Sequence, residues 1–436
     1  MAASVFGSAI YGKLFDPGEA GRLFSDAAEM RAMLLVEGAL AKAQGALGVI
    51  PEVSGAAIHR AAMELQLDPS SLGAATGQNG VPVPALVARF REEMQAPEHA
   101  QYVHWGATSQ DIMDTALMLR LRQALALAEK AVRAVLARLA DMAEDGAETP
   151  CPARTYGQIA TPTSWGAVVA GFGAPILAAL RDLGNVRAGL YVSLSGAAGT
   201  SSALGPRAAE TRAALAEALG LADPGRSWHT DRSPLMAIAD WQCRVIAAGA
   251  SVGQTLIGLS AHGEVSLGPV GASSTMPQKQ NPVGPSALVA LNTYAGGQRA
   301  ALQSAAAHQF SRDGAAWFAE WMPLPQITLT CAACLKTLVA VADGLEPRPD
   351  AMRAALDGSM AFAEALSFAL AAQMPRPAAQ AQVKALCREA ETQGVPLEHV
   401  ARAAHELPEG LFDVGAMGHA PAEARAFAAA VREALG

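Results

Sequence analysis

The sequence predicts a protein built from packed α-helices, on three observations. Hydrophobic residues make up 51% of the chain and aromatic residues only 5%, and many of the apolar residues are alanine. This composition favours closely packed helices over a β-sandwich, which draws on β-branched and aromatic residues. Residues 107–145 contain neither Gly nor Pro, and their apolar side chains recur every three or four positions, the period of one helical face. Several similar long segments follow.

The first predicted helix covers residues 25–47 and ends near Gly48. Residues 76–84 are predicted to be a loop because of their Gly and Pro content. The next helix follows Ala107, and Thr108 with Asp111 three residues later resembles a capping box. About 35 helical residues span roughly 50 Å at 1.5 Å per residue, which indicates a bundle of long helices.

More long helices are predicted downstream. After residues 347–349 the composition changes, and the sequence favours several short helices. Pro234 and Pro282 each lie at a helix start, where proline is tolerated. The predicted long helices cover 163–188, 234–261, 282–307 and 325–343, and short ones cover 351–356 and 422–435. The predicted domains are an N-terminal helical domain at 1–111, a long-helix bundle at 112–348 and a small C-terminal helical domain at 349–436.

Charge and composition narrow the possible functions and partners. The formal net charge is −8 and no basic block is present, which argues against binding to nucleic acid. A few local cations can still bind an anionic substrate. The N-terminus lacks the pattern of a signal peptide, and Gly, Ser or charged residues interrupt the apolar stretches, so we expect no membrane partner. The expected location is the cytoplasm.

The five cysteines do not indicate a disulfide framework or a metal site. Cys331 and Cys334 have CxxC spacing, but they lie in an apolar run and no second Cys/His pair follows at zinc spacing. Packing inside a helix is favoured over metal or redox use, because free Cys behaves as a small hydrophobe. No P-loop, HExxH or EF-hand motif is present, and we expect neither a metal nor a cofactor.

The strongest chemical signal is the loop 271–282, with the sequence GASSTMPQKQNP. Its Gly/Ser backbone can present N–H groups to an anion, and the helix that follows adds partial positive charge. Lys279 adds a full charge, and Ser274 supplies a hydroxyl that could carry a proton. On these residues alone, the loop is either an anion-binding site or a polar connection between helices.

Other segments give weaker signals. Thr108, Ser109 and Gln110 lie at a helix start suited to a carboxylate, although ordinary N-capping explains part of this pattern. His104 is equally consistent with a core histidine and a substrate contact. The Gly-rich stretch 194–200 lacks dinucleotide-binding spacing and is interpreted as a tight turn. Three further segments carry candidate cations or polar groups, with solvated surface as the default for the last two: Arg154 to Gln158, Arg312 and His229.

The loop residues carry a family resemblance. The run from Ser273 to Pro282 resembles the signature SSxMPxKxNP of the fumarase/aspartase superfamily. Segments 102–111, 228–232 and 317–321 resemble the bacterial 3-carboxy-cis,cis-muconate cycloisomerases, in matching order and spacing over nearly the whole chain. The resemblance implies an all-α fold of three domains, with a central bundle of five long helices, and a homotetramer whose active sites are each assembled from three subunits.

The resemblance also implies a reaction. A carboxylate of 3-carboxy-cis,cis-muconate, a small polycarboxylate, adds across a double bond to give 4-carboxymuconolactone through an aci-carboxylate intermediate. Such an intermediate needs prearranged donors where its charge develops. In this sequence the implied proton carrier is Ser274. The implied stabilisers of the intermediate are Lys279 and Asn281, and the implied substrate-binding residues are Thr108, Ser109, Gln158 and Arg312, with His104 and Arg154 as additional candidates.

Two positions depart from the family pattern. Tyr156 stands where many lyases of the superfamily carry His, and Ile159 stands where some cycloisomerases carry His. Tyr156 could act instead, but its reference pKa near 10 would have to fall considerably for base work. The acid–base partner and the exact substrate are therefore open. The alternatives are a β-elimination lyase that releases fumarate from a succinyl compound such as adenylosuccinate, and a catalytically silent structural protein on the same scaffold.

Overall fold

The computed structural model describes residues 4–268, 271–272, 276, 280–357 and 359–436. In this part of the chain, helices dominate and the strands form three two-stranded sheets, so the predicted all-α class is confirmed. The chain divides into two compact units. The first unit comprises Met1–Lys130, Asp182–Ile246 and Leu291–Lys336, and the second comprises Ala131–Arg181, Ala247–Ala290 and Thr337–Gly436. The boundaries of the three predicted domains stay a prediction.

Five long helices of 22 to 37 residues lie partly in each unit. All of them were predicted, and their ends agree with the predicted ends within two residues. Their bounds are Ser109–Asp145 (α6), Trp165–Ala188 (α7), Ser233–Ala261 (α9), Val283–Ala305 (α10) and Pro323–Gly344 (α12).

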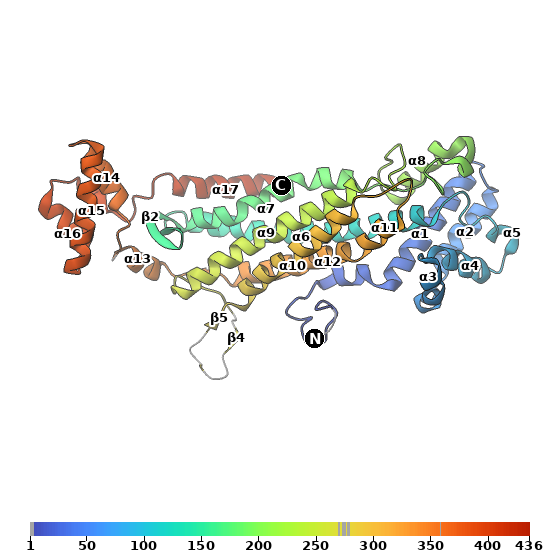
Figure 1. Cartoon of the computed structure of the whole chain (residues 1–436), viewed down its shortest axis with the longest axis horizontal. Coiled ribbons are helices and arrows are strands. Elements are labelled where there is room, and N and C mark those ends of the chain that lie inside the picture. The colour runs from blue at the N-terminus through green and yellow to red at the C-terminus, as the bar shows by residue number, and fades with distance from the viewer. Residues whose placement is uncertain (1–3, 269–270, 273–275, 277–279, 358) are drawn as a thin grey trace. The chain divides into compact units, whose positions relative to one another are not determined.

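In the first unit, the two helices α1 (Asp26–Ala46) and α2 (Glu52–Glu64) pack side by side (Figure 1). The side chain of Ser25 caps α1 by accepting a hydrogen bond from the backbone N–H of Ala28. A Cβ atom on Gly55 would lie 2.6 Å from the Ala41 carbonyl oxygen, so glycine is what allows this close approach. The prediction of a helix over 25–47 is confirmed.

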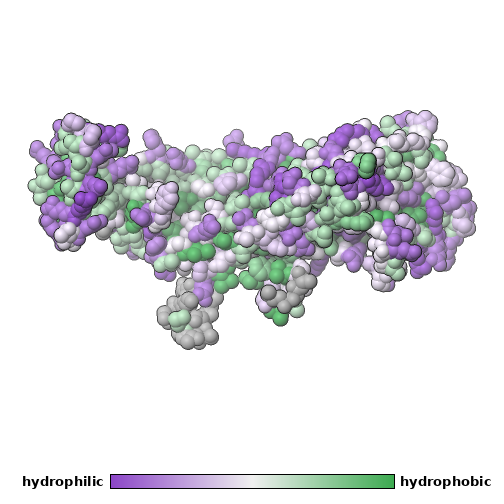
Figure 2. Space-filling model, in the orientation of Figure 1, coloured by the Kyte–Doolittle hydropathy of each residue, from purple (hydrophilic) through white to green (hydrophobic). Residues whose placement is uncertain are grey.

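Helix α4 (Val83–Glu93) shows how the N-terminal helices build their core. Val83, Leu86 and Phe90 are fully buried on one face, while charged residues such as Arg89 and Glu92 are exposed on the other. On the face drawn in Figure 2, hydrophilic residues are dense over the N-terminal helices of this unit. Amphipathic helices thus supply both the core and the polar surface.

The prediction of a loop over 76–84 is wrong in most of its length. Helix α3 (Gly73–Asn79) covers the first half, and α4 covers the end. Gly80, with a φ of 76°, ends α3 in the left-handed conformation that glycine adopts readily. Pro84 lies in the first turn of α4, where its missing N–H costs nothing. The glycine and proline here therefore mark helix ends and not a long loop.

The remaining elements of the first unit are short. They are η1 (Gly18–Phe24), η2 (Pro69–Leu72), α5 (Pro97–Ala100), η3 (Ser202–Arg207), α8 (Ala208–Leu219) and α11 (Gly314–Trp321). Between α7 and η3, Gly196 and Gly199 have φ values of 72° and 75°, and the N–H of Ser201 donates to the carbonyl of Ser195. The tight turn predicted at 194–200 is confirmed.

In the second unit, a β-hairpin precedes α7, where the sequence had predicted no strands. Strands β1 (Pro150–Thr155) and β2 (Gln158–Ser164) pair antiparallel, and Thr155 faces Gln158 across a two-residue turn. Tyr156 and Gly157 form this turn with φ values of 52° and 78°. Positive φ at both central residues is the geometry that a tight hairpin requires.

Two more strand pairs belong to this unit, together with its helices. Strands β3 (Val265–Ser266) and β6 (Glu346–Pro347) pair, as do β4 (Gly271–Ala272) and β5 (Gln280–Asn281). The backbone of the predicted loop 271–282 is therefore paired at its two ends, and α10 begins directly after Pro282, as predicted. The helices are α13 (Pro349–Asp357), α14 (Ala363–Ala371), α15 (Arg376–Gln393), α16 (Leu397–Ala404), η4 (Glu409–Phe412) and α17 (Ala420–Leu435).

Helices α14, α15 and α16 share a core of their own, which includes Leu370 and Leu386. Helix α17 instead pairs with the C-terminal half of α6. Arg425 forms a 2.6 Å ion pair with Glu148 just beyond α6, and Arg432 contacts Asp141 at 3.6 Å. These pairs are exposed, so each contributes little to stability.

The apolar helices bear on the expectations for the cysteines and for the membrane. Cys331 and Cys334 are buried within α12, and burial raises the pKa of both thiols, that of Cys334 to about 12. Among the described residues, no cluster of His, Cys, Asp and Glu could hold a metal. Two stretches, 165–188 and 314–344, are long and apolar enough to span a membrane, contrary to expectation. In the 18-residue apolar window of each, 50% and 61% of the residues are buried within the chain, as in a core helix.

A matched glycine pair in α7 tests the packing of the second unit. A Cβ atom on Gly166 would lie 2.2 Å from the Ala143 carbonyl oxygen, whereas one on Gly171 would meet nothing within 4 Å. We expect Gly166→Ala to destabilise the protein by about 1–3 kcal/mol. Gly171→Ala should leave stability unchanged or raise it by up to about 1 kcal/mol. Thermal unfolding measures both, and equal effects would contradict the inferred contact.

Candidate functional site

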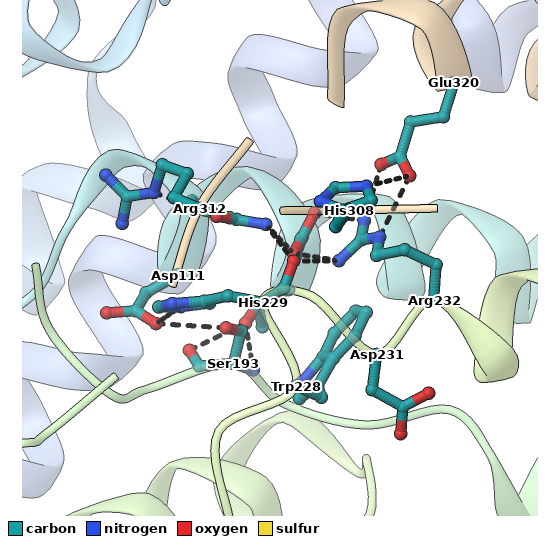
Figure 3. Close-up of polar contacts among 12 residues, drawn as sticks. Asp111, Ser193, Trp228, His229, Asp231, Arg232, His308, Arg312 and Glu320 are labelled. Atoms are coloured by element: carbon teal, nitrogen blue, oxygen red, sulfur yellow. Dashed lines mark hydrogen bonds and ion pairs between the residues drawn. The ribbon is translucent and has the colours of Figure 1, made fainter. Parts of the chain in front are cut away.

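A buried carboxylate, Asp111, organises the candidate site in the first unit (Figure 3). It lies at the third position of α6, and its side chain accepts a hydrogen bond from the N–H of Thr108, which confirms the capping interaction. Its other donors come from distant segments. They are the Ser193 hydroxyl at 3.0 Å, the Ser195 N–H at 3.0 Å, the Gly196 N–H at 2.9 Å and the His229 Nε2 at 2.8 Å.

The hydrogen bonds around Asp111, called the Asp111 hub below, place His229 in the interior. This corrects the expectation that His229 lies on a solvated surface. The side chain is 2% exposed. Its Nε2 binds Asp111, while its Nδ1 has no hydrogen-bond partner among the described residues. The ring therefore serves to hold the Asp111 carboxylate in place.

Arg312 lies at the start of the same helix, although it is 204 residues from Thr108 in sequence. Its Nη2 donates to the Thr108 hydroxyl at 3.0 Å, and its Nε donates to the Gln110 side-chain oxygen at 3.0 Å. In turn, the Gln110 amide donates to the His229 carbonyl at 2.9 Å. Within the described chain, no carboxylate forms an ion pair with Arg312. Its charge is thus available, beside a helix N-terminus, for an anion.

The predicted substrate-binding residues separate into two groups. Thr108, Ser109 and Arg312 come together at the start of α6, with Ser109 as its first residue. His104 lies just upstream, with its Nδ1 2.6 Å from a carboxylate oxygen of Glu37. The second group, Arg154 and Gln158, belongs to the hairpin of the other unit, which also carries Tyr156, the candidate acid–base residue, in its turn. Their roles stay predictions.

Arg154 and Tyr156 have contrasting surroundings in the second unit. Arg154 forms a two-pronged ion pair with the buried Glu264, in which Nη1 lies 2.9 Å from Oε2. The side chain of Tyr156 is fully exposed at the tip of the hairpin. Arg154 and Glu264 line a cavity of about 610 Å³ with the hairpin residue Gly157.

The signature loop is described only in part. Ser274 and Lys279, the predicted proton carrier and carboxylate-binding cation, lie outside the described residues. Asn281 is described, and it is half-buried in β5 opposite Gly271. The role of this loop therefore stays a prediction.

A second ionic cluster is formed by Asp114 of α6, Arg232 and Glu320. The sequence did not predict it. Arg232 is bound between two carboxylates, at 2.8 Å from Asp114 and 2.9 Å from Glu320, and all three side chains are at most 2% exposed. Burial alone would lower the pKa of Arg232, but the two carboxylates outweigh it and raise that pKa. Burial raises the pKa of Glu320 to about 7, against the opposing charge of Arg232.

This ionic cluster packs next to the site, but its side chains are not part of the anion-binding group of Thr108, Ser109 and Arg312. The Arg232 guanidinium stacks 4.9 Å from the Trp228 ring centre, and the Trp228 indole donates to the Val192 carbonyl at 2.9 Å. A cavity of about 410 Å³ is lined by Asp114, Glu320 and Trp317. Neither Thr108 nor Arg312 lines this cavity, so it is separate from the anion site.

The comparisons with known proteins agree with the predicted superfamily. A family model described as lyase matches residues 20–295. The 3-carboxy-cis,cis-muconate cycloisomerase of Pseudomonas aeruginosa is 38% identical over 382 residues, which cover 85% of this chain and 83% of that protein. The nitrosuccinate lyase of Streptomyces davaonensis is 33% identical over 407 residues, covering 89% and 85%. The crystal structure of the 3-carboxy-cis,cis-muconate lactonizing enzyme from Pseudomonas putida matches with a TM-score of 0.90 at 31% identity, covering 98% of this chain and all of that one.

The Asp111 hub can be tested by one isosteric substitution. In Asp111→Asn the amide NH2 would face N–H donors, and two or more buried groups would lose their acceptor. We expect a loss of about 1–3 kcal/mol per unsatisfied group, seen as a lower midpoint of thermal unfolding. The control is Asp231→Asn, because Asp231 is a partly exposed residue paired with Arg226. Its effect should stay below about 1 kcal/mol, and a similar loss in both variants would refute the hub.

Proposed function

This chain belongs to the lyase family of the fumarase/aspartase superfamily, and we propose that it is a cycloisomerase that interconverts 3-carboxy-cis,cis-muconate and 4-carboxymuconolactone. The predicted enzyme class agrees with the names of the relatives, of which the Pseudomonas aeruginosa cycloisomerase is 38% identical. The reaction is an intramolecular addition of a carboxylate to a double bond. It involves no redox step, and the proposed enzyme needs no cofactor.

The observation that carries the proposal in the structure is the position of Arg312. A guanidinium with no carboxylate partner in the described chain lies beside Thr108 at the N-terminus of α6. The proposed substrate is a tricarboxylate, so its binding needs several cationic or hydrogen-bond-donating positions of this kind. A fork of N–H donors suits one carboxylate, and the half-buried site strengthens the attraction. The Thr108 and Ser109 hydroxyls and the helix N-terminus would complete the binding of that carboxylate.

The chemical step concerns the electron-rich aci-carboxylate. As the ring closes, the electron pair of the double bond moves toward the neighbouring carboxylate, and a proton then adds to the carbon next to it. Fixed donors stabilise this charge best because they need no rearrangement during the reaction. In the proposal, Ser274 carries the proton, and Lys279 and Asn281 stabilise the intermediate.

We also propose that the chain works as a homotetramer in the cytoplasm. The exposed position of Tyr156 supports the assembly, because a side chain at the tip of a hairpin can enter a site formed by a partner subunit. The same reasoning applies to Gln158, which is exposed in β2. Gln158 would then contribute to substrate binding in another subunit, and Tyr156 would be the candidate acid–base residue there.

A second candidate is a β-elimination lyase that acts on a succinyl-type compound. The 33% identity with nitrosuccinate lyase supports this candidate. A β-elimination and the cycloisomerisation both move a proton on the carbon next to a carboxylate. A structural protein without activity is the third candidate.

An absorbance assay separates the three candidates. Purified protein is incubated with 3-carboxy-cis,cis-muconate, and we expect loss of the ultraviolet absorbance of the conjugated diene as the lactone forms. The Ser274→Ala variant should be slower by about 10²–10⁴-fold, the usual contribution of a proton-transfer group. Fumarate release from adenylosuccinate without muconate turnover would reject the cycloisomerase. No turnover of either compound would favour the structural protein.

The anion site predicts a graded response to substitution of Arg312. Arg312→Met should lower kcat/KM about 10- to 100-fold, because it removes a charged hydrogen-bonding partner of the substrate. Arg312→Lys should recover part of this loss, since it keeps the charge but not the fork. The control is Arg207→Met, because Arg207 is exposed and binds Glu210 and the Leu47 carbonyl, neither of which is a predicted site residue. Steady-state kinetics that show equal losses at both arginines would contradict the assignment.

A further inference from the structure

We propose that Glu264 is a positioning residue of the reaction, which anchors the hairpin of β1 and β2 through Arg154 and thereby places Gln158 for substrate binding. The inference rests on the proposed function for the role of Gln158. It assigns Arg154 a different role from the substrate contact that the sequence suggests, and it assigns Glu264 a role that the sequence does not suggest.

The first support is the geometry of the ion pair. Both terminal nitrogens of Arg154 bind the Glu264 carboxylate, and Nη1 lies 2.9 Å from Oε2. The Glu264 side chain is 1% exposed and that of Arg154 is 16% exposed. A two-pronged pair fixes the orientation of the guanidinium as well as its distance. Because both prongs are occupied, Arg154 does not offer this fork to a substrate carboxylate.

The second support is the rigid backbone that carries Glu264. It lies between the end of α9 at Ala261 and strand β3, which begins at the next residue. Its N–H donates to the Leu259 carbonyl at 2.9 Å, and its carbonyl accepts from the Arg348 N–H at 2.8 Å. Glu264 is therefore a fixed point to which a neighbouring segment can be anchored.

The third support is the place of Arg154 in the hairpin. It faces Ile159 across the strands, and only the four exposed residues 155–158 lie beyond this pair. No side chain of these four forms a hydrogen bond or ion pair within the described chain. Ile159 packs against an apolar cluster that includes Leu356 and Phe362. The last anchored positions before the turn are therefore Ile159, through apolar contact, and Arg154, through a directional ion pair.

The fourth support is a β-bulge beside Arg154. Pro152 faces Pro162 and Arg154 faces Ile159, so residues 160 and 161 of β2 face the single residue 153 of β1. A bulge disrupts the ladder locally, and beyond it only two residue pairs join the strands. Such a short two-stranded segment is marginally stable on its own. The outer part of the hairpin thus depends on its side-chain anchors.

Gln158 depends on this anchor directly, because it pairs with Thr155, the residue after Arg154. In the proposed function, the Gln158 amide binds a substrate carboxylate that does not react. Such a contact is equally strong in the bound substrate and in the transition state, so its loss raises KM and leaves kcat nearly unchanged. Loss of the ion pair should therefore act on KM, through the position of Gln158.

The first test is a double-mutant cycle between Glu264 and Gln158. Glu264→Gln keeps the shape of the side chain but removes its charge. We expect it to raise KM for 3-carboxy-cis,cis-muconate about 10- to 100-fold, with kcat changed less than about threefold. Gln158→Ala should have a similar effect. In the double variant KM should stay near that of Gln158→Ala alone, because Glu264 acts through Gln158.

Two outcomes of this cycle would overturn the inference: effects on KM that multiply in the double variant, or an unchanged KM in Gln158→Ala. The control is Asp223→Asn, because Asp223 is a carboxylate of the first unit that binds the part-buried Arg212 at 2.6 Å. This variant should leave KM as in the wild type. An equal rise of KM in Asp223→Asn would show a general effect of losing an ion pair.

A second variant separates positioning from stability. Removal of one partner leaves a buried charge unpaired, whereas Arg154→Met combined with Glu264→Met removes both charges. We expect the double Met variant to fold, with an unchanged circular dichroism spectrum and an unfolding midpoint near that of the wild type. Its KM should nevertheless stay raised, because apolar contact does not fix the hairpin in one orientation. A wild-type KM in this variant would show that the pair serves stability alone.

A readout without substrate distinguishes failure of this inference from failure of the proposed function. Hydrogen exchange of backbone amides at residues 155–159 should be about 10-fold faster in Glu264→Gln and in the double Met variant, while that of α15 stays unchanged. Asp223→Asn should exchange like the wild type. If the wild type turns over neither the muconate nor adenylosuccinate, the proposed function fails. Unchanged exchange at the hairpin overturns the anchor whatever the substrate.

Discussion

The carboxylate of Asp111 is the interaction on which the arrangement of the site depends. It is buried, and a buried carboxylate is tolerated only when hydrogen bonds replace its hydration. Its donors come from the start of α6, from the turn at residues 193–196 and from His229, which lies 118 residues away. Because these segments must converge to satisfy one charge, their positions are fixed together. The position of the helix N-terminus that receives Arg312 follows from that convergence.

Much of the fold could be predicted from the helical spacing of apolar residues and from the Gly and Pro residues at helix ends. Long helices such as α6 and α9 have apolar residues at helical spacing and clear ends, and propensity and packing agree there. The prediction failed at 76–84 because Gly80 and Pro84 are compatible with both a loop and closely spaced helix ends. It also missed the hairpin at 150–164, whose strands contain prolines and lack alternation. The Tyr156–Gly157 pair was the available signal for its tight turn.

The site was less predictable, for a physical reason. Local patterns indicated the cap at Asp111 and the anion-binding start of α6. They could not show which distant groups would meet there, since partners such as Thr108 and Arg312 are 204 residues apart. His229 was expected on the surface because a short polar run resembles a solvated loop. Glu320 carried a usable signal, because a charged residue between the tryptophans at 317 and 321 indicates a buried partner. Nothing comparable in the sequence identified Glu37 as the partner of His104.

The Arg232 cluster has a consequence for how this fold can diverge. Its three ionic side chains are at most 2% exposed, and loss of any one leaves charge buried without compensation. A single substitution at these positions is therefore strongly disfavoured, and a neutral replacement requires coordinated changes in three segments of the chain. Exposed segments such as the tip of the hairpin carry no such constraint. Tolerated substitutions are thus expected first outside this ionic core, because each of its three members depends on the other two.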